Sequence, residues 1–201
     1  MLPKALENAI EALSSLPGVG PRTAERYAYY LFKSNSKLAD NIADALANLH
    51  DGVKFCPITF ALIDADEDMS SFYTDPKRDK TTILVVEEPL DIYAIEQTHG
   101  YNGTYHVLGG ALSPIDGITP DQLHIKELIE RTDKDAVKEV IIATNPSVEG
   151  ESTALLIEKM LHEKNPDLKL TRLARGLPLG VDLSYADQIT LSAALENRTK
   201  L

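Results

Sequence analysis

The chain has 201 residues, enough for one large domain or roughly two to three small ones. Apolar residues make up 43% of it and charged residues 25%, a globular composition that excludes a disordered chain. The formal net charge of −11 excludes a surface that attracts nucleic acid as a whole, because phosphates are repelled at long range, so DNA binding would need a local basic patch.

The number of cysteines and the lengths of the apolar runs indicate the cellular compartment of the protein. The single cysteine, Cys56, excludes an internal disulfide framework. The first residues lack a long apolar core and include Glu7, so we expect no signal peptide. No apolar run is long enough to predict a membrane span. These features favour a cytoplasmic protein.

Residues 3–49 have the pattern of three helices, with an interruption that reads LPGVGP at residues 16–21. Apolar residues recur at helical spacing in each run. They are Leu6, Ile10 and Leu13, then Tyr27, Tyr30 and Leu31, then Leu38, Ile42, Leu46 and Leu49.

The interruption is typical of a helix–hairpin–helix. Two glycines permit a tight turn and a close approach to a ligand, and the start of the next helix offers N–H groups to a phosphate. Basic residues one turn apart follow on that helix. A glycine-rich turn between core helices, with solvated arginines, remains the alternative. The candidate DNA-binding residues are Gly18, Gly20, Arg22, Arg26, Lys33 and Lys37.

Residues 53–80 are polar and lack clear periodicity. Cys56 by itself is most simply a small buried residue. The segment also holds apolar residues that can form a small cluster, namely Phe55, Phe60, Leu62, Ile63, Phe72 and Tyr73.

From residue 81 the chain alternates between apolar strands and helices. This order predicts a four-stranded parallel sheet covered on both faces, within an α/β fold. The predicted strands are residues 83–86, 105–108, 140–143 and 168–173, and the predicted helices are residues 91–99, 121–131 and 151–163.

Acidic residues follow two of these strands, where α/β sheets usually bind ligands. The second strand end reads TNPSVEGE at residues 144–151. Two alternatives to a binding site remain. Residues 145–147 can be a simple turn with an N-cap, and the acids can serve only to stabilise the starts of helices. We expect the acidic residues to meet in one cluster that contacts a partner or binds a metal weakly. They are Glu87, Glu88, Asp91, Glu149 and Glu151.

The remaining chain offers no other chemistry. Gly and Pro residues at 176–182 precede a predicted short helix whose apolar residues must pack on the sheet or on another subunit. The histidines lack metal-ligand spacing, and no Walker A or GxSxG sequence is present. The residues concerned are Tyr185, Ile189, Leu191 and Leu195 in the tail, and the histidines His99, His106, His124 and His162.

The strand–Glu and strand–TNPSVEGE pair resembles the Toprim domain, whose pattern is strand–Glu followed by DPDxEGE. In that family the Glu and two Asp residues gather Mg²⁺ for phosphoryl chemistry. Here Asn145 and Ser147 stand in place of the two aspartates, while Glu149-Gly150-Glu151 is intact. Because Mg²⁺ is bound through carboxylates, the resemblance implies the frame of a metal site with much of its charge removed.

The whole chain from about residue 6 resembles the bacterial recombination mediator family RecR. The motifs are LPGVGP (16–21), VVEEP (85–89), YHVLGGALSP (105–114), ATNP (143–146) and GLP (176–178). The resemblance implies a four-cysteine zinc module, whose positions fall here on Cys56, Thr59, Ser70 and Tyr73. A structural zinc needs four Cys or His ligands, so we expect no metal and no other cofactor.

We therefore predict a non-enzymatic recombination mediator of DNA repair, located at the nucleoid. The resemblance implies a homotetrameric ring that binds single- and double-stranded DNA without sequence preference and contacts RecO-like and RecF-like proteins. The rivals are a Toprim-type metal-dependent nuclease or primase, and a structural protein whose hairpin only mediates self-association. The predicted parts are a helix–hairpin–helix domain (1–52), a degenerate zinc-finger segment (53–80), a Toprim domain (81–176) and an assembly tail (177–201).

Overall fold

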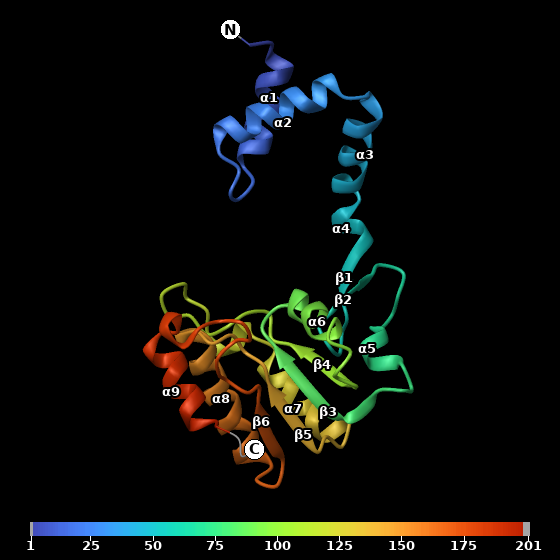
Figure 1. Ribbon diagram of the computed structural model, residues 1–201. Helices are drawn as coiled ribbons and strands as arrows, with labels where there is room; N and C mark the ends of the chain where they lie inside the picture. Colours follow the sequence, from blue (N-terminus) through green and yellow to red (C-terminus); the bar gives the residue numbers. More distant parts are fainter. Residues whose placement is uncertain (1, 199–201) are drawn as a thin grey trace. The chain divides into compact units, whose positions relative to one another are not determined.

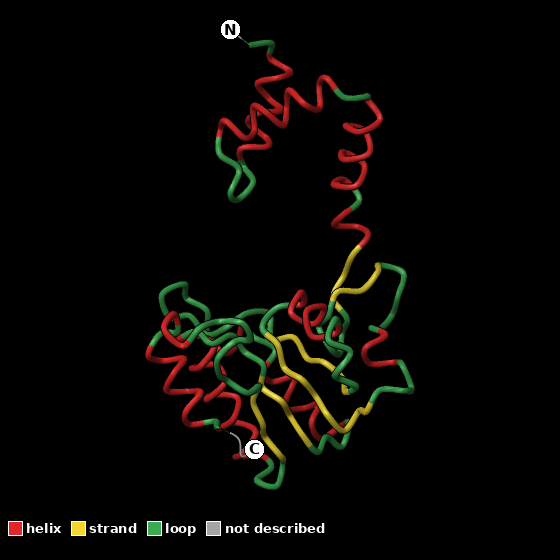
Figure 2. The backbone as a smooth tube through the Cα atoms, viewed as in Figure 1, coloured by secondary structure: helices red, strands yellow, loops and turns green. Residues whose placement is uncertain are grey.

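The computed structural model describes residues 2–198, which fall into two compact units (Figure 1). The helical unit comprises the chain up to Lys54 together with Asp64–Asp66. The sheet unit comprises Phe55–Ile63 and the chain from Glu67 onward. Figure 2 shows the change in secondary structure along the chain, with helices before Val53 and the first strand starting there.

Helices build the helical unit. They are α1 (Lys4–Ser14), α2 (Pro21–Lys33), α3 (Ser36–Ala47) and the short α4 (Leu49–Gly52). Ala24 and Ala28 lie one turn apart on α2 and are buried where α1 packs against it. The Asn35 side chain caps α3 by accepting a hydrogen bond from the Lys37 amide at 3.1 Å. The predicted run of three helices is confirmed.

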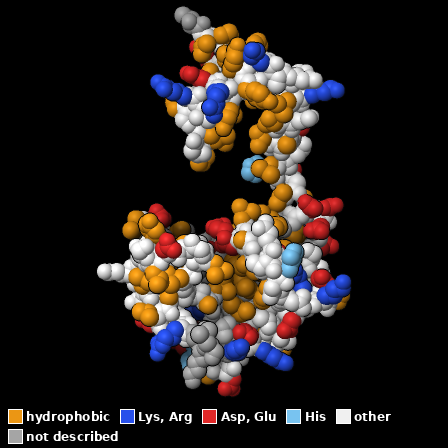
Figure 3. Space-filling view, in the orientation of Figure 1, with side chains coloured by type: hydrophobic (Ala, Val, Ile, Leu, Met, Phe, Trp, Pro, Cys, Tyr) orange, Lys and Arg blue, Asp and Glu red, His pale blue; other side chains and the backbone are white. Residues whose placement is uncertain are grey.

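The apolar side of α3 has no cover within the helical unit. The name α3 face is used here for Leu38, Ile42 and Leu46 of α3 together with Leu49 at the start of α4. All four are exposed, and Leu46 is 64% exposed. Apolar side chains gather along this helix in Figure 3. Isolated apolar residues are common on surfaces, whereas a continuous row of them marks an interaction surface.

Residues 53–80 form a small layer of turns. β1 (Val53–Phe55) and β2 (Leu62–Asp64) pair in a two-stranded sheet, and α5 (Ser71–Thr74) follows. Ala61 is buried, and Phe60 and Phe72 pack beside it against the main sheet. Phe55 is 63% exposed, so the predicted apolar cluster is wrong in including it. All three residues of its strand, β1, are exposed.

A four-stranded parallel sheet is the centre of the sheet unit. Its strands are β3 (Asp79–Val86), β4 (Gly103–Val107), β5 (Glu139–Ile142) and β6 (Lys169–Arg172), in the order β4-β3-β5-β6. The central strands are rich in Val and Ile because both of their faces are covered. The predicted α/β fold class is confirmed, and all four strands end at the same edge.

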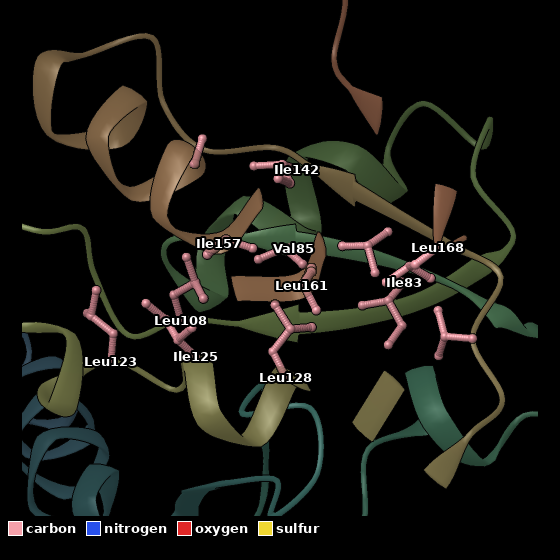
Figure 4. Close-up of a cluster of buried hydrophobic side chains, with 13 residues drawn as sticks. Ile83, Val85, Leu108, Leu123, Ile125, Leu128, Ile142, Ile157, Leu161 and Leu168 are labelled. Atoms are coloured by element: carbon pink, nitrogen blue, oxygen red, sulfur yellow. The ribbon is translucent and has the colours of Figure 1, made fainter. Parts of the chain in front are cut away.

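One face of the sheet is covered by α7 (Ile125–Lys134) and α8 (Val148–Lys164). Figure 4 shows Ile83 and Val85 of β3 packed with Leu128, Ile157 and Leu161 of these helices. Each is fully buried or nearly so. Burying a side chain of this size contributes about 1.5–3 kcal/mol, so this cluster dominates the stability of the unit.

The opposite face is covered by α6 (Pro89–Glu96) and by Phe60, Ala61 and Phe72 of the segment before β3. Leu84 and Val86 alternate with the residues of the first face, as the strand pleat requires, and pack with Ile92 of α6 and Tyr105 of β4. The turns of residues 53–80 are therefore part of the wall of this second core.

Two predicted helix positions are corrected. Residues 121–131 were expected to be one helix, but Pro120 starts a separate turn, η1 (Pro120–Gln122), and α7 begins only at Ile125. Tyr185 lies in η2 (Leu183–Tyr185) and not on the tail helix α9 (Gln188–Glu196), because the Asp187 side chain caps that helix at the Thr190 amide. Helix α7 thus starts at Ile125 and helix α9 at Gln188, both later in the chain than predicted.

The tail leaves its apolar residues exposed, including Leu179, Tyr185, Ile189 and Leu195. Like the α3 face, they find no partner within the described part of the chain. None of the helices within residues 2–198 has the length and apolar content to cross a membrane.

Candidate functional site

The hairpin between α1 and α2 has the predicted open geometry. Gly18 adopts φ +78°, a backbone conformation that residues with a side chain rarely adopt. Gly20 is the N-cap residue of α2. No atom lies within 4 Å of where a Cβ would stand at either glycine. Among the described residues, the amides of Gly18 and Gly20 have no hydrogen-bond partner. The hairpin therefore offers free N–H groups at an accessible turn.

Basic side chains continue from this turn along one face of α2. Arg22, Arg26 and Lys33 share that face by helical spacing, and Arg22 and Arg26 are exposed. Within residues 2–198, none of the three is paired with an acid. Arg26 lies 5.8 Å from the Tyr27 ring centre and Lys33 5.5 Å from that of Tyr29. The charges are thus held on the surface without being neutralised.

Lys37 lies beyond this face, in the first turn of α3. Its backbone amide caps the helix through Asn35, and its side chain is free of ion pairs with described residues. The predicted strip therefore consists of the α2 face, with Lys37 on the following helix.

At the sheet edge, Glu87 and Asn145 are joined directly. Glu87 follows β3 and is only 7% exposed. Its carboxylate accepts hydrogen bonds from the Asn145 backbone amide at 2.9 Å and from the Asn145 side-chain amide at 2.5 Å. An aspartate at this position would repel Glu87 unless a cation lay between them. The amide side chain therefore replaces a metal-bridged carboxylate pair with a direct hydrogen bond.

The turn after Asn145 is closed in the same way. The Ser147 hydroxyl caps α8 by accepting a hydrogen bond from the Gly150 amide at 3.0 Å. A Cβ on Gly150 would stand 2.2 Å from the Asn145 carbonyl oxygen and 2.7 Å from a Glu87 oxygen. The glycine is required because the helix start packs directly on the Glu87–Asn145 pair.

Glu151 is neutralised by two arginines. It pairs with Arg172 at 2.7 Å and with Arg175 at 2.5 Å. The hydrogen bonds from Arg172 and then Arg175 lower the pKa of the Glu151 carboxyl. Its charge is therefore paired with the last residue of β6 and with the segment that follows the strand.

The other acids differ in exposure. Glu88 and Glu149 are exposed, and Asp91 is half-buried. Asp91 accepts a hydrogen bond from the Glu88 amide at 2.9 Å, which fixes the start of α6. Their charges remain available at the surface.

The prediction of one acidic cluster is therefore corrected. Glu87 and Glu151 are each held by partners of their own, and only Glu88, Asp91 and Glu149 present charge to solvent. No three His, Cys, Asp or Glu side chains within residues 2–198 are placed to hold a metal ion. The residues at this edge do not fit a Mg²⁺ site.

The four positions matching the zinc ligands of the resembled family lie in residues 53–80. Cys56, Thr59 and Ser70 are buried together, but Tyr73 directs its hydroxyl to Asp135 at 2.9 Å. One thiol, two hydroxyls and a phenol do not fit a tetrahedral zinc. The residues here do not fit this metal either.

His106 has a structural role that was not predicted. It is fully buried on β4, and its Nε2–H donates to the His124 carbonyl at 2.7 Å, while Nδ1 has no partner within the described chain. Burial lowers its pKa to about 3 despite that hydrogen bond. His124 stacks on Phe60 with ring centres 3.6 Å apart. His106 lies within the predicted strand of residues 105–108, and no further pattern in the sequence signals its burial.

Comparison with known proteins bears on both units. Family models described as "RecR, helix-hairpin-helix", "Toprim domain" and "RecR, C-terminal" match residues 6–50, 81–174 and 176–199. The chain is 48% identical over 199 residues to Recombination protein RecR of Moorella thermoacetica, covering 99% of this chain and 98% of that protein. It is 46% identical over 197 residues to the protein of the same name from Thermobifida fusca, covering 98% and 97%.

A helix–hairpin–helix joined to a Toprim sheet places the protein in the class of Toprim proteins that act in DNA recombination. The near-complete coverage by relatives of one name narrows this further. The chain belongs to the RecR family, and its function is that of a recombination mediator in DNA repair.

Proposed function

We propose that this protein is a non-catalytic DNA-binding scaffold, and that the hairpin of the helical unit is its DNA site. The supporting observation is the row of exposed, unpaired basic side chains that begins at the open turn of Gly18 and Gly20. Arg22, Arg26 and Lys33 contact phosphates from α2, and Lys37 extends the contact. Since phosphate carries no base identity, both single- and double-stranded DNA bind without sequence preference.

The Toprim edge takes no part in phosphoryl transfer in this proposal. Mg²⁺ catalysis needs carboxylates that converge on the ion. Here both oxygens of the Glu87 carboxylate instead accept hydrogen bonds from Asn145. The exposed Glu88 and Glu149 and the half-buried Asp91 then serve as contacts for basic residues of RecO-like or RecF-like partners.

Assembly is the third part of the proposal. The α3 face and the tail both expose apolar side chains that the chain itself does not cover. We assign them to contacts between copies of the chain, which close a tetrameric ring. Because each hairpin carries few charges, several hairpins acting on one DNA raise the affinity through effective concentration. Such a ring works at the nucleoid, in the cytoplasm.

Fluorescence anisotropy with labelled single- and double-stranded DNA tests the DNA site. The double variant Arg22→Glu/Arg26→Glu is expected to lose DNA binding while keeping its oligomeric mass. The wild type should show affinity that falls steeply with salt, because bound phosphates release counterions. The matched control is Lys134→Glu/Lys138→Glu, the same charge change on exposed residues of the sheet unit.

The control is expected to bind DNA with the salt slope of the wild type. If the hairpin variant retains binding with an unchanged slope, the hairpin is not the DNA site. If the two variants lose affinity equally, the effect is one of net charge and the proposed site is wrong.

A further inference from the structure

The two turns at Cys56–Thr59 and Ser70–Tyr73 keep the form of a metal knuckle without its ligands. Each pair is three residues apart, which is the spacing of two C-x₂-C pairs around a tetrahedral zinc. The family matches cover residues 6–50 and 81–174 and leave this segment between them. The structure nevertheless folds the segment into a compact layer against the sheet.

The Cys56 sulfur occupies the junction of the two turns. It accepts hydrogen bonds from the Thr59 amide at 3.5 Å, in its own turn, and from the Ser70 amide at 3.4 Å, in the other. Burial raises the pKa of the thiol, but hydrogen bonds from Thr59 and Ser70 outweigh it and lower the pKa overall. The sulfur thus links the turns through backbone amides, where a metal would link them through thiolates.

The next two positions use their hydroxyls to close the turns. Thr59 is fully buried, and its Oγ1 accepts a hydrogen bond from the Ala61 amide at 3.3 Å. Ser70 is 1% exposed, and its Oγ accepts from the Phe72 amide at 3.2 Å as the cap of α5. Both side chains satisfy backbone groups of their own turn, so neither is left as an unpaired buried polar group.

The fourth position anchors the segment to the sheet unit. The Tyr73 hydroxyl donates to Asp135 at 2.9 Å, and the other Asp135 oxygen accepts from Arg131 Nε at 2.9 Å. Lys80 Nζ lies 4.4 Å and Arg131 Cζ 5.2 Å from the centre of the Tyr73 ring. Asp135 and Arg131 are almost fully buried.

Arg131 extends this anchor into β4. Its two terminal nitrogens donate to the Tyr105 carbonyl oxygen and to the Thr104 hydroxyl, at 2.5 Å and 2.7 Å. A chain of hydrogen bonds therefore joins Tyr73, through Asp135 and Arg131, to strand β4 of the main sheet. Buried polar chains of this kind are costly to interrupt, because the group left behind stays unpaired.

We propose that residues 53–80 are a metal-free knuckle, whose two turns are held together without zinc. The groups that hold them are the Cys56 thiol, the Thr59 and Ser70 hydroxyls and the Tyr73–Asp135 anchor. A structural zinc supplies folding free energy to its module, and loss of the metal normally unfolds it. Here the segment is held by hydrogen bonds to its own backbone, by the anchor, and by the packing of Phe60, Ala61 and Phe72 on the sheet.

Elemental analysis of protein purified without chelator is the first test. We expect no stoichiometric zinc and a melting temperature that is unchanged by strong chelator. A stoichiometric zinc that is lost together with several degrees of melting temperature on chelation would overturn the proposal. A Cys56→Ala variant distinguishes the role of the sulfur, because it should melt lower than the wild type although no metal is lost.

Tyr73→Phe tests the anchor, since it keeps the ring beside Lys80 and Arg131 and removes only the hydroxyl. The melting temperature should fall by about 2–4 °C, the shift expected for one buried hydrogen bond in a chain of this size. The matched control is Tyr185→Phe, at a tyrosine that is 82% exposed, and it should melt like the wild type. Equal melting temperatures for both variants would show that the anchor contributes nothing.

A triple variant, Thr59→Cys/Ser70→Cys/Tyr73→Cys, tests whether the turns retain knuckle geometry. It should take up one zinc per chain and become sensitive to chelator, unlike the wild type. If it takes up no zinc, the two turns do not have the geometry of a metal knuckle, and that part of the proposal fails.

Discussion

The helical unit and the edge of the sheet differ in how far their functional-looking side chains find partners within the chain. The sheet unit pairs its functional-looking acids internally: Glu87 with Asn145, and Glu151 with two arginines. The helical unit leaves both its basic residues and the α3 face exposed. A site whose charges are already satisfied has little left for a substrate, whereas unsatisfied charges and apolar side chains call for partners. The contrast supports the proposal that the helical unit binds DNA, and that the closed sheet edge takes no part in phosphoryl transfer.

The largest expected effect concerns the α3 face. Ile42→Asp/Leu46→Asp places two charges on a surface that we assign to contact between chains, so size-exclusion chromatography with light scattering should show a smaller assembly. Because both residues are already exposed, the helix content of the variant should stay that of the wild type.

Leu90→Asp is the control for this change, since Leu90 is 70% exposed on α6 of the sheet unit. It should leave the mass unaltered. An unaltered mass for the α3 variant as well would mean that the α3 face is not an assembly surface. The comparison would then rest on the charged residues alone.

The second prediction compares one glycine from each unit. Gly150→Ala drives a Cβ into the Asn145 carbonyl and Glu87, so the free energy of unfolding should fall by roughly 3 kcal/mol. Gly20→Ala adds its Cβ to open space at an allowed φ of −76°, and the cost should stay below about 1 kcal/mol. Denaturant unfolding measures both. Similar losses at the two sites would contradict the close packing at the sheet edge.

These close contacts mark the limit of what the sequence predicts. Hydrophobic periodicity and glycine–proline punctuation predicted the parallel sheet and the helical hairpin, because both patterns are local. The Glu87–Asn145 and Tyr73–Asp135 pairs join residues 58 and 62 positions apart, and no local pattern signals them. The acids were predicted to form one cluster because they share a sheet edge, yet sharing an edge does not decide which side chains turn inward.

The third prediction is a pH effect confined to the sheet unit. His106 has its pKa lowered by burial to about 3, against 6.5 for the free side chain. Below about pH 6.5 the unfolded chain therefore binds a proton that the folded chain does not, and stability should fall by about 1.4 kcal/mol per pH unit. Denaturant unfolding from about pH 7 to about pH 5 measures this slope, before carboxylates begin to titrate.

His106→Gln should remove that slope, whatever its effect on absolute stability. His162→Gln, at an exposed histidine of α8, should keep it. A slope that persists in the His106 variant would show that another group titrates, and that the buried histidine is not the acid-sensitive point of the sheet unit.

The most direct test of the central claim is to ask whether the protein binds DNA and leaves it intact. Labelled single- and double-stranded DNA is incubated with the protein and Mg²⁺ or Mn²⁺, and binding and chain length are followed in the same samples. The closed Glu87–Asn145 pair and the open hairpin predict DNA that is bound and uncut under all conditions. Metal-dependent cleavage that disappears in a Glu88→Gln variant would contradict the account, because it would make the sheet edge a working phosphoryl-transfer site.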